Sequence, residues 1–130
     1  MVIGILPDAA RRVIMEQADL KNAPVHPSPE VRINRLGEGA RQVSVQCPGE
    51  YHFITEFSLL GDFQLDNLAA ALVVISLLNK RGFKVSVDEI KRALSAMEFP
   101  GRLQVVCRDP VIIADAGHNP HGGKAVAASL

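Results

Sequence analysis

The residues best suited to chemistry follow a fully apolar run at residues 111–114, which predicts a strand. This strand would deliver Asp115 at its carboxyl end, with His118 a few residues later and Asn119-Pro120 fitting the N-cap and first position of a helix. In open α/β sheets, ligands bind beyond the carboxyl ends of strands, and the start of a helix favours phosphate. Asp115 could therefore accept hydrogen bonds from a ribose or engage a metal, and His118 could donate to a phosphate oxygen. The alternative is a well-capped turn that holds no ligand, because strand–turn–helix junctions are common.

Two other segments could also face a ligand. Arg102 follows a Pro-Gly bend, where its guanidinium could reach a phosphate or carboxylate through two parallel bonds, or could simply be a surface side chain. Asn67 falls in the first turn of an expected apolar helix, where its amide could face a ligand. The alternative for this segment is a plain capping region, with Asp62 or Asp66 as the N-cap.

The composition indicates a globular chain without a strong bias in charge. It has 130 residues, of which 48% are hydrophobic, and its 14 basic residues balance 14 acidic ones. This balance argues against binding to nucleic acid or to an anionic membrane. Residues 65–78 are too short and too polar to cross a bilayer, which takes about 20 apolar residues. Cys47 and Cys107 form no CxxC pair, so we expect reduced thiols in a cytoplasmic protein, and no set of residues has metal-ligand spacing.

The hydrophobic pattern predicts an α/β fold that includes a small antiparallel meander. A strand at 2–6, a helix from Asp8 as its N-cap to about 21 and an extended segment at 23–25 come first, and residues 26–29 are predicted to be non-helical. Three short antiparallel strands are expected within 31–58, with turns at 37–39 and 48–49.

The second half of the chain is predicted to be helical and then mixed. We expect a helix at 65–79, a second helix that begins with the capping box Ser86…Glu89, strands at 103–107 and 111–114, and a final helix after Asn119. The chain stops inside this last apolar helix without a C-cap signal. We therefore expect it to be a fragment of a longer polypeptide.

Together, three segments resemble the dihydrofolate synthase/folylpolyglutamate synthase family of the Mur ligase superfamily. They are LGDFQLDNLAAAL at 60–72, FPGRLQ at 99–104 and DAGHNPH at 115–121, and their order and spacing also match. The His-Asn-Pro is shared more widely among Mur ligases, whereas Pro-Gly-Arg-Leu-Gln favours the folate branch. The resemblance spans most of the chain, and residues 31–58 match only in character.

The resemblance implies a fold and a division into domains. Residues 1–99 would be part of a Mur-ligase-like ATP-binding central domain, with parallel strands, helices and the meander. Residues 100–130 would be the first β-β-α of a Rossmann-like C-terminal glutamate ligase domain. The family's P-loop, magnesium ligands and modified lysine are expected outside this chain, so the fragment alone is predicted to be inactive.

The resemblance also implies an activity for the full-length parent. The family uses ATP and Mg²⁺ to add glutamate to dihydropteroate or to a folate tail, through an acyl phosphate. Asn67, Arg102 and Asp115 fall on ATP-contacting positions, and His118 is the catalytic candidate near the nucleotide. We expect small-molecule substrates, neither nucleic acid nor membrane as a partner, and a monomeric parent. Two alternatives are a Mur-type ligase acting on a cell-wall peptide and a non-catalytic α/β binding module.

Overall fold

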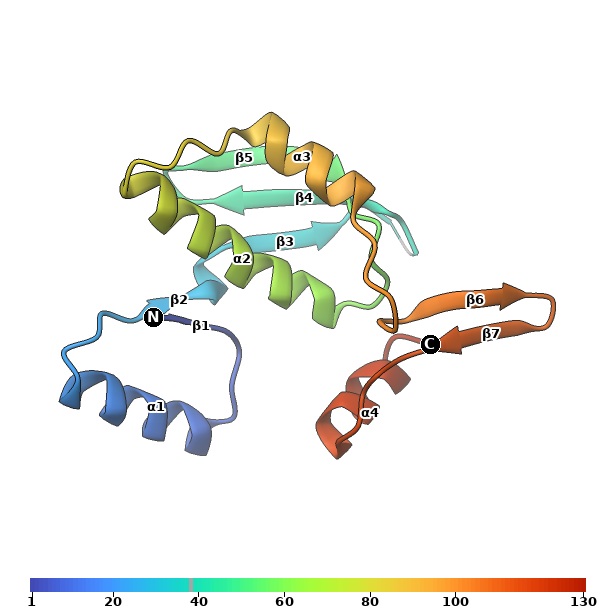
Figure 1. Cartoon of the computed structure of the whole chain (residues 1–130), viewed down its shortest axis with the longest axis horizontal. Coiled ribbons are helices and arrows are strands. Elements are labelled where there is room, and N and C mark those ends of the chain that lie inside the picture. The colour runs from blue at the N-terminus through green and yellow to red at the C-terminus, as the bar shows by residue number, and fades with distance from the viewer. Residues whose placement is uncertain (38) are drawn as a thin grey trace.

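The computed structural model of the chain describes residues 1–37 and 39–130 as a mixed α/β arrangement (Figure 1). In chain order, its elements are β1 (Val2–Ile3), α1 (Asp8–Leu20), β2 (His26–Pro27), the 3₁₀ helix η1 (Ser28–Glu30), β3 (Arg32–Arg35), β4 (Gln42–Cys47), β5 (Tyr51–Glu56), α2 (Phe63–Lys80), α3 (Val87–Ala96), β6 (Gln104–Arg108), β7 (Val111–Ala114) and α4 (Pro120–Ala127). The predicted α/β class is confirmed. The expected turn at 37–39 includes Glu38, which lies outside the described residues.

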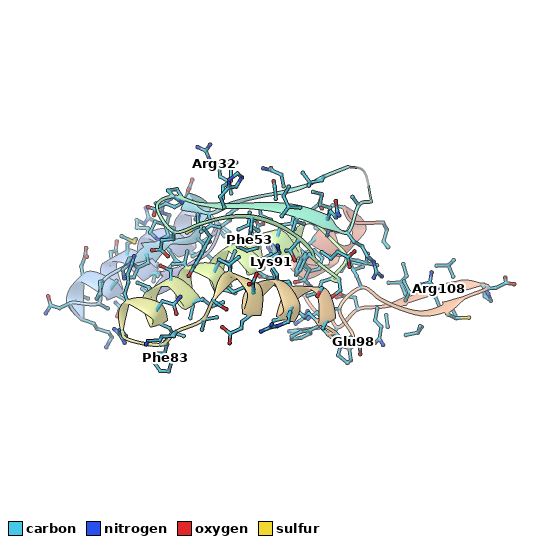
Figure 2. All side chains as sticks on the ribbon, turned by 90° about the horizontal axis from the view of Figure 1, so that it is seen from above. Arg32, Phe53, Phe83, Lys91, Glu98 and Arg108 are labelled. Carbon is cyan, nitrogen blue, oxygen red and sulfur yellow. The ribbon has the colours of Figure 1, made fainter. Side chains whose placement is uncertain are left out.

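The core lies between the β3–β4–β5 meander and the helices α2 and α3. The three strands pair antiparallel in sequence order, as predicted, and Val43 and Val45 on β4 are both 0% exposed. Alternation along the strands sends Phe53 toward the helices and Arg32 away from them (Figure 2). Leu72 of α2 is also 0% exposed and belongs to the same buried cluster. One sandwiched layer of apolar side chains thus holds the meander and both helices together.

In the N-terminal segment, β1 and β2 form a short parallel pair of strands, and α1 connects them. β1 pairs with β2 over Val2–Ile3 only, so the predicted strand at 2–6 is longer than the observed one. The partner of β1, strand β2, is two residues long and contains Pro27, which has no N–H to donate to the neighbouring strand. The prediction that Asp8 caps α1 is wrong, because Pro7 occupies the N-cap position and no side chain caps this end.

Two further local predictions need correction. Residues 26–29 were expected to be non-helical, but η1 begins at Ser28, because Pro29 falls at the start of the turn, where a missing N–H costs nothing. Asp62 holds the N-cap position of α2, yet its side chain makes no cap hydrogen bond and its backbone is already helical. Its carboxylate instead accepts a bond from Arg35 of β3 at 3.1 Å.

Two predicted helix-start signals are confirmed, a capping box and a single side-chain cap. Ser86 and Glu89 form the complete capping box at the start of α3. Asn119 caps α4 by accepting a hydrogen bond from the Gly122 amide at 2.8 Å. The hairpin β6–β7 and α4 form the expected β-β-α unit. None of the described helices is both long enough and apolar enough to cross a membrane.

An ion pair joins the β4–β5 turn to the end of α2. Glu50 Oε1 lies 2.7 Å from Lys80 Nζ, and hydrogen bonds from Lys80 and then Ser76 hold the pKa of Glu50 below its ordinary value. Because the folded pKa is the lower one, this carboxylate stabilises the fold above its unfolded pKa, and the contribution is lost as pH falls through the folded pKa.

We therefore expect Glu50→Gln to lower the free energy of unfolding at neutral pH. The difference from the unchanged chain should shrink as pH is lowered from about 7 to about 3, because both chains then carry an uncharged group at this position. Urea unfolding at several pH values measures this difference. Glu16→Gln, at an exposed position on α1, is the control. A difference that stays constant with pH would contradict the assignment.

Candidate functional site

A cavity of about 800 Å³ lies where several segments of the chain meet. The segments are the loop after β1, the loop between β5 and α2, α2 itself, α3, the bend before β6, and the β7–α4 junction with α4. Most of its wall is apolar, and its polar side chains are Gln64, Asp66, Asn67, Arg102, Asp115 and His121. A hollow of this size, with apolar walls and a few polar groups, is typical of small-molecule sites. Asn67, Arg102 and Asp115, predicted from three separate segments, therefore line one cavity.

Asp115 ties the β7–α4 junction to the bend before β6. Its Oδ2 accepts a hydrogen bond from the Leu103 amide at 3.0 Å, and its Oδ1 accepts one from the Gly117 amide at 2.6 Å. Each carboxylate oxygen can accept a further bond, so the half-buried side chain can hold the backbone and still receive a hydroxyl from a ligand. The capped-turn and ligand-binding interpretations of this residue are thus compatible.

The bend that carries Arg102 is fixed by two further hydrogen bonds. The Gly101 amide donates to Gln104 Oε1 at 3.0 Å, and the Ala116 amide donates to the Gly101 carbonyl at 2.8 Å. Arg102 itself is exposed, and within the described residues its guanidinium has no side-chain hydrogen bond or ion pair. The backbone is therefore held in place while the guanidinium remains available for an anion.

Leu103 connects this bend to the segment that leads into α2. It is 2% exposed, and a Cβ at Gly61 would come within 2.6 Å of its Cδ1. Gly61 also has φ +87°, a conformation that favours glycine. The loop before α2 and the bend before β6 thus approach each other closely at this point, which places Asn67 and Arg102 around the same space.

The polar end of α2 presents an amide and a carboxyl group to the cavity. Asn67 Nδ2 donates to Oε1 of the buried Gln64 at 2.9 Å, which orients the Asn67 side chain. Burial, with a smaller contribution from the charge on Asp62, raises the pKa of Asp66 above its ordinary value. Asp66 is therefore more readily protonated than a fully exposed aspartate.

The two histidines of this region occupy different places. His118, the catalytic candidate from the sequence, is exposed and is absent from the cavity wall, and its Nδ1 lies 3.2 Å from the Ala116 carbonyl. His121, in the first turn of α4, lines the cavity instead. His121 was not among the predicted site residues, although its place in the first turn of a capped helix that follows a strand was a usable signal.

Arg35 is the residue that sequence reasoning missed most clearly. From β3, it donates through Nε to Asp62 at 3.1 Å, through Nη1 to the Ala40 carbonyl at 3.0 Å and through Nη2 to the Leu59 carbonyl at 3.1 Å. The Gly61 carbonyl lies 3.4 Å from the same Nη2. One guanidinium thereby holds the loop that leads into α2 and its cavity-lining residues.

The chain is similar in sequence to proteins named as folylpolyglutamate synthases or dihydrofolate synthases. No family model matches it. It is 36% identical over 90 residues to a probable bifunctional folylpolyglutamate synthase/dihydropteroate synthase of Halobacterium salinarum, a match that covers 68% of this chain and 11% of that protein. It is 24% identical over 134 residues to a dihydrofolate synthase/folylpolyglutamate synthase of Bacillus subtilis, covering 100% of this chain and 31% of that protein.

A cell-wall ligase is also similar. The chain is 42% identical over 72 residues to UDP-N-acetylmuramoyl-L-alanyl-D-glutamate–2,6-diaminopimelate ligase of Aquifex aeolicus, covering 55% of this chain and 14% of that enzyme. In every one of these matches, the chain spans less than a third of the length of its relative.

Solved structures share the fold over almost the whole chain. A folylpolyglutamate synthase–AMPPCP–folate complex matches with a TM-score of 0.85 at 20% identity, covering 98% of this chain and 32% of that one. The Mycobacterium tuberculosis folylpolyglutamate synthase complexed with ADP and AMPPCP matches with a TM-score of 0.80 at 24% identity, covering 99% and 29%. The sequence matches therefore confirm the resemblance to the folylpolyglutamate synthase/dihydrofolate synthase family, and the Aquifex match supports a relation to the Mur ligases. The solved structures show that the chain shares their fold.

Proposed function

We propose that this chain is part of an ATP-dependent ligase that joins glutamate to dihydropteroate or to a folate tail through an acyl phosphate. The observation that carries the proposal is the convergence of Asn67, Arg102 and Asp115 on one cavity. The names of relatives from several bacteria and an archaeon support the ligase class, and similar solved proteins are described as complexed with ADP, AMPPCP or folate. The cavity would hold the adenine nucleotide.

The chemistry of the three side chains fits different parts of a nucleotide. The Arg102 guanidinium can bind two phosphate oxygens at once, and its charge offsets the negative charge that develops during phosphoryl transfer. Asp115 can accept a bond from a ribose hydroxyl, and the Asn67 amide can both donate to and accept from a base. His118 remains the proposed catalytic residue, although reaching a ligand in the cavity would require its ring to turn away from the Ala116 carbonyl.

The Mg²⁺ ligands of the parent are proposed to lie outside this chain. Among residues 1–37 and 39–130, no group of three or more histidine, cysteine or acidic side chains is arranged to hold a metal ion. No step is assigned to the metal here. When bound to a nucleotide, Mg²⁺ offsets the charge of its phosphates.

The proposed domain boundary lies at the bend that carries Arg102. We assign residues 1–99 to the central ATP-binding domain and residues 100–130 to the start of the C-terminal domain. Three features support this division: the core cluster of α2, α3 and the meander precedes the boundary, β6–β7–α4 follows it, and the cavity is lined from both sides. We also propose a cytoplasmic parent acting on small molecules, supported by the free thiols of Cys47 and Cys107.

The test is an assay of the full-length parent. We expect phosphate release that depends on ATP, dihydropteroate and glutamate, and we expect Arg102→Ala to lower its rate about tenfold or more, because a transition-state contact is lost. Arg12→Ala, at an exposed position on α1, is the control and should leave the rate unchanged. An Arg102→Ala rate within about twofold of the parent would overturn the site assignment.

A second candidate function is that of a Mur-type ligase acting on a nucleotide-linked cell-wall peptide. The specific observation in its favour is the 42% identity to the diaminopimelate ligase over 72 residues. Competition between dihydropteroate and cell-wall precursors in the full enzyme separates the two ligases. A parent that binds no nucleotide in calorimetry would leave the non-catalytic binding module as the surviving alternative.

A further inference from the structure

A second hollow, of about 430 Å³, lies against the bend, and arginines from three segments line it. Arg41 precedes β4, Arg102 follows the Pro-Gly bend and Arg108 ends β6. Glu98 is the single carboxylate among the described residues that line this hollow. Three guanidinium groups against one carboxylate leave an excess of two positive charges. We call this hollow the arginine groove.

The charges of the arginine groove are not balanced by neighbouring side chains. Within the described part of the chain, the guanidinium groups of Arg41, Arg102 and Arg108 make no side-chain hydrogen bond and no ion pair. Arg35, in contrast, donates hydrogen bonds to Asp62 and to two backbone carbonyls. Figure 2 shows Glu98 beside the segment that leaves α3 and Arg108 out on the β6–β7 hairpin. Like charges gathered around one hollow repel each other, and a bound anion relieves that repulsion.

The lining of the groove also suits an anion that carries several acceptor oxygens. Its lining includes Leu103, which is 2% exposed, so the dielectric constant beside this residue is lower than in open water. Gln104 accepts a bond from Gly101 through Oε1, which leaves its NH₂ group as a further donor. Guanidinium groups bind carboxylate and phosphate oxygens through two parallel bonds each.

We propose that the arginine groove binds a small polyanion carrying two or more carboxylate or phosphoryl groups. We assign this site to the groove and not to the cavity, although the two hollows adjoin and share four lining residues, Leu59, Met97, Phe99 and Arg102. Arg41 and Arg108 line the groove and are not part of the cavity wall, so they report on the groove alone.

The test is calorimetric titration of the 130-residue chain at low salt with two probes, inorganic pyrophosphate and citrate. We expect at least one probe to bind with a Kd in the millimolar range or below, and Arg41→Gln and Arg108→Gln each to weaken it about fivefold or more. The tighter probe identifies whether the site prefers phosphoryl or carboxylate groups. Both arginines are exposed and lack side-chain partners, so thermal melting should show unchanged stability in both variants.

The matched control is Arg32→Gln, which removes an exposed arginine from the outward face of β3, outside the groove. We expect less than about a twofold change in this variant, because only the long-range charge is altered. The proposal is overturned if neither probe binds, if Arg32→Gln weakens binding as much as Arg41→Gln, or if both groove variants bind like the unchanged chain. The last result would place the anion in the cavity. A separate ADP titration of the parent tests the nucleotide site, so the two proposals can fail independently.

Discussion

Replacement of Gly61 by alanine is expected to lower the free energy of unfolding by about 3 kcal/mol, against about 1 kcal/mol for Gly82→Ala. Both glycines have positive φ angles, +87° and +99°, so both variants bear the cost of a left-handed alanine. A Cβ at Gly61 would also meet Leu103 Cδ1 at 2.6 Å and Phe63 Cε1 at 2.7 Å, whereas nothing lies within 4 Å at Gly82. The difference between the variants therefore measures the close approach.

Urea unfolding followed by circular dichroism measures both changes, and a double mutant identifies the cause. Leu103→Ala removes the side chain that the new methyl group would meet, so Gly61→Ala should cost less in that background. The contact assignment fails if Gly61→Ala and Gly82→Ala cost the same, or if the two changes at positions 61 and 103 are additive.

Replacement of Arg35 by methionine is expected to lower the free energy of unfolding by about 2 kcal/mol or more. The half-buried guanidinium donates to the Ala40 and Leu59 carbonyls and to Asp62 at 3.0–3.1 Å, and methionine leaves these acceptors without their donor. We expect Arg35→Lys to recover only part of the loss, because an ammonium group lacks the planar fork.

Arg32→Met is the matched control for this prediction. Arg32 lies on the same strand but points away from the helices, so its replacement should change stability by less than about 0.5 kcal/mol. Equal losses of stability at positions 32 and 35 would contradict this prediction. They would show that removing a positive charge from β3 lowers stability, and that the Arg35 hydrogen bonds to Ala40, Leu59 and Asp62 do not. Thermal and urea unfolding of the variants provide the measurement.

The sequence predicted those features of the fold and the site that depend on neighbouring residues. The Ser86…Glu89 box and the Asn119 cap each join positions three residues apart, so their types alone specify the bond. The expected grouping of Asn67, Arg102 and Asp115 rested on the resemblance of three segments. Their common lining of one cavity agrees with it, while their roles stay proposals.

The features that could not be predicted depend on contacts between distant residues. Arg35 and Asp62 are 27 positions apart, and no local pattern indicates that a strand arginine takes up the carboxylate expected to cap α2. His118 and His121 are three positions apart at the start of α4, and the residue types do not tell which of the two lines the cavity. The short β1 likewise follows from the length of its partner β2.

The position of Leu103 has a consequence for how the two sides of the cavity can separate. The Leu103 amide donates a hydrogen bond to Asp115, and the Leu103 side chain is buried beside Gly61. This leucine therefore connects the β7–α4 junction to the loop that leads into α2. Drawing the walls apart exposes this leucine to water at a cost of about 2 kcal/mol. Separation of the walls is therefore a discrete step with a threshold, and at room temperature the closed arrangement predominates by more than an order of magnitude unless a ligand or another part of the protein offsets that cost.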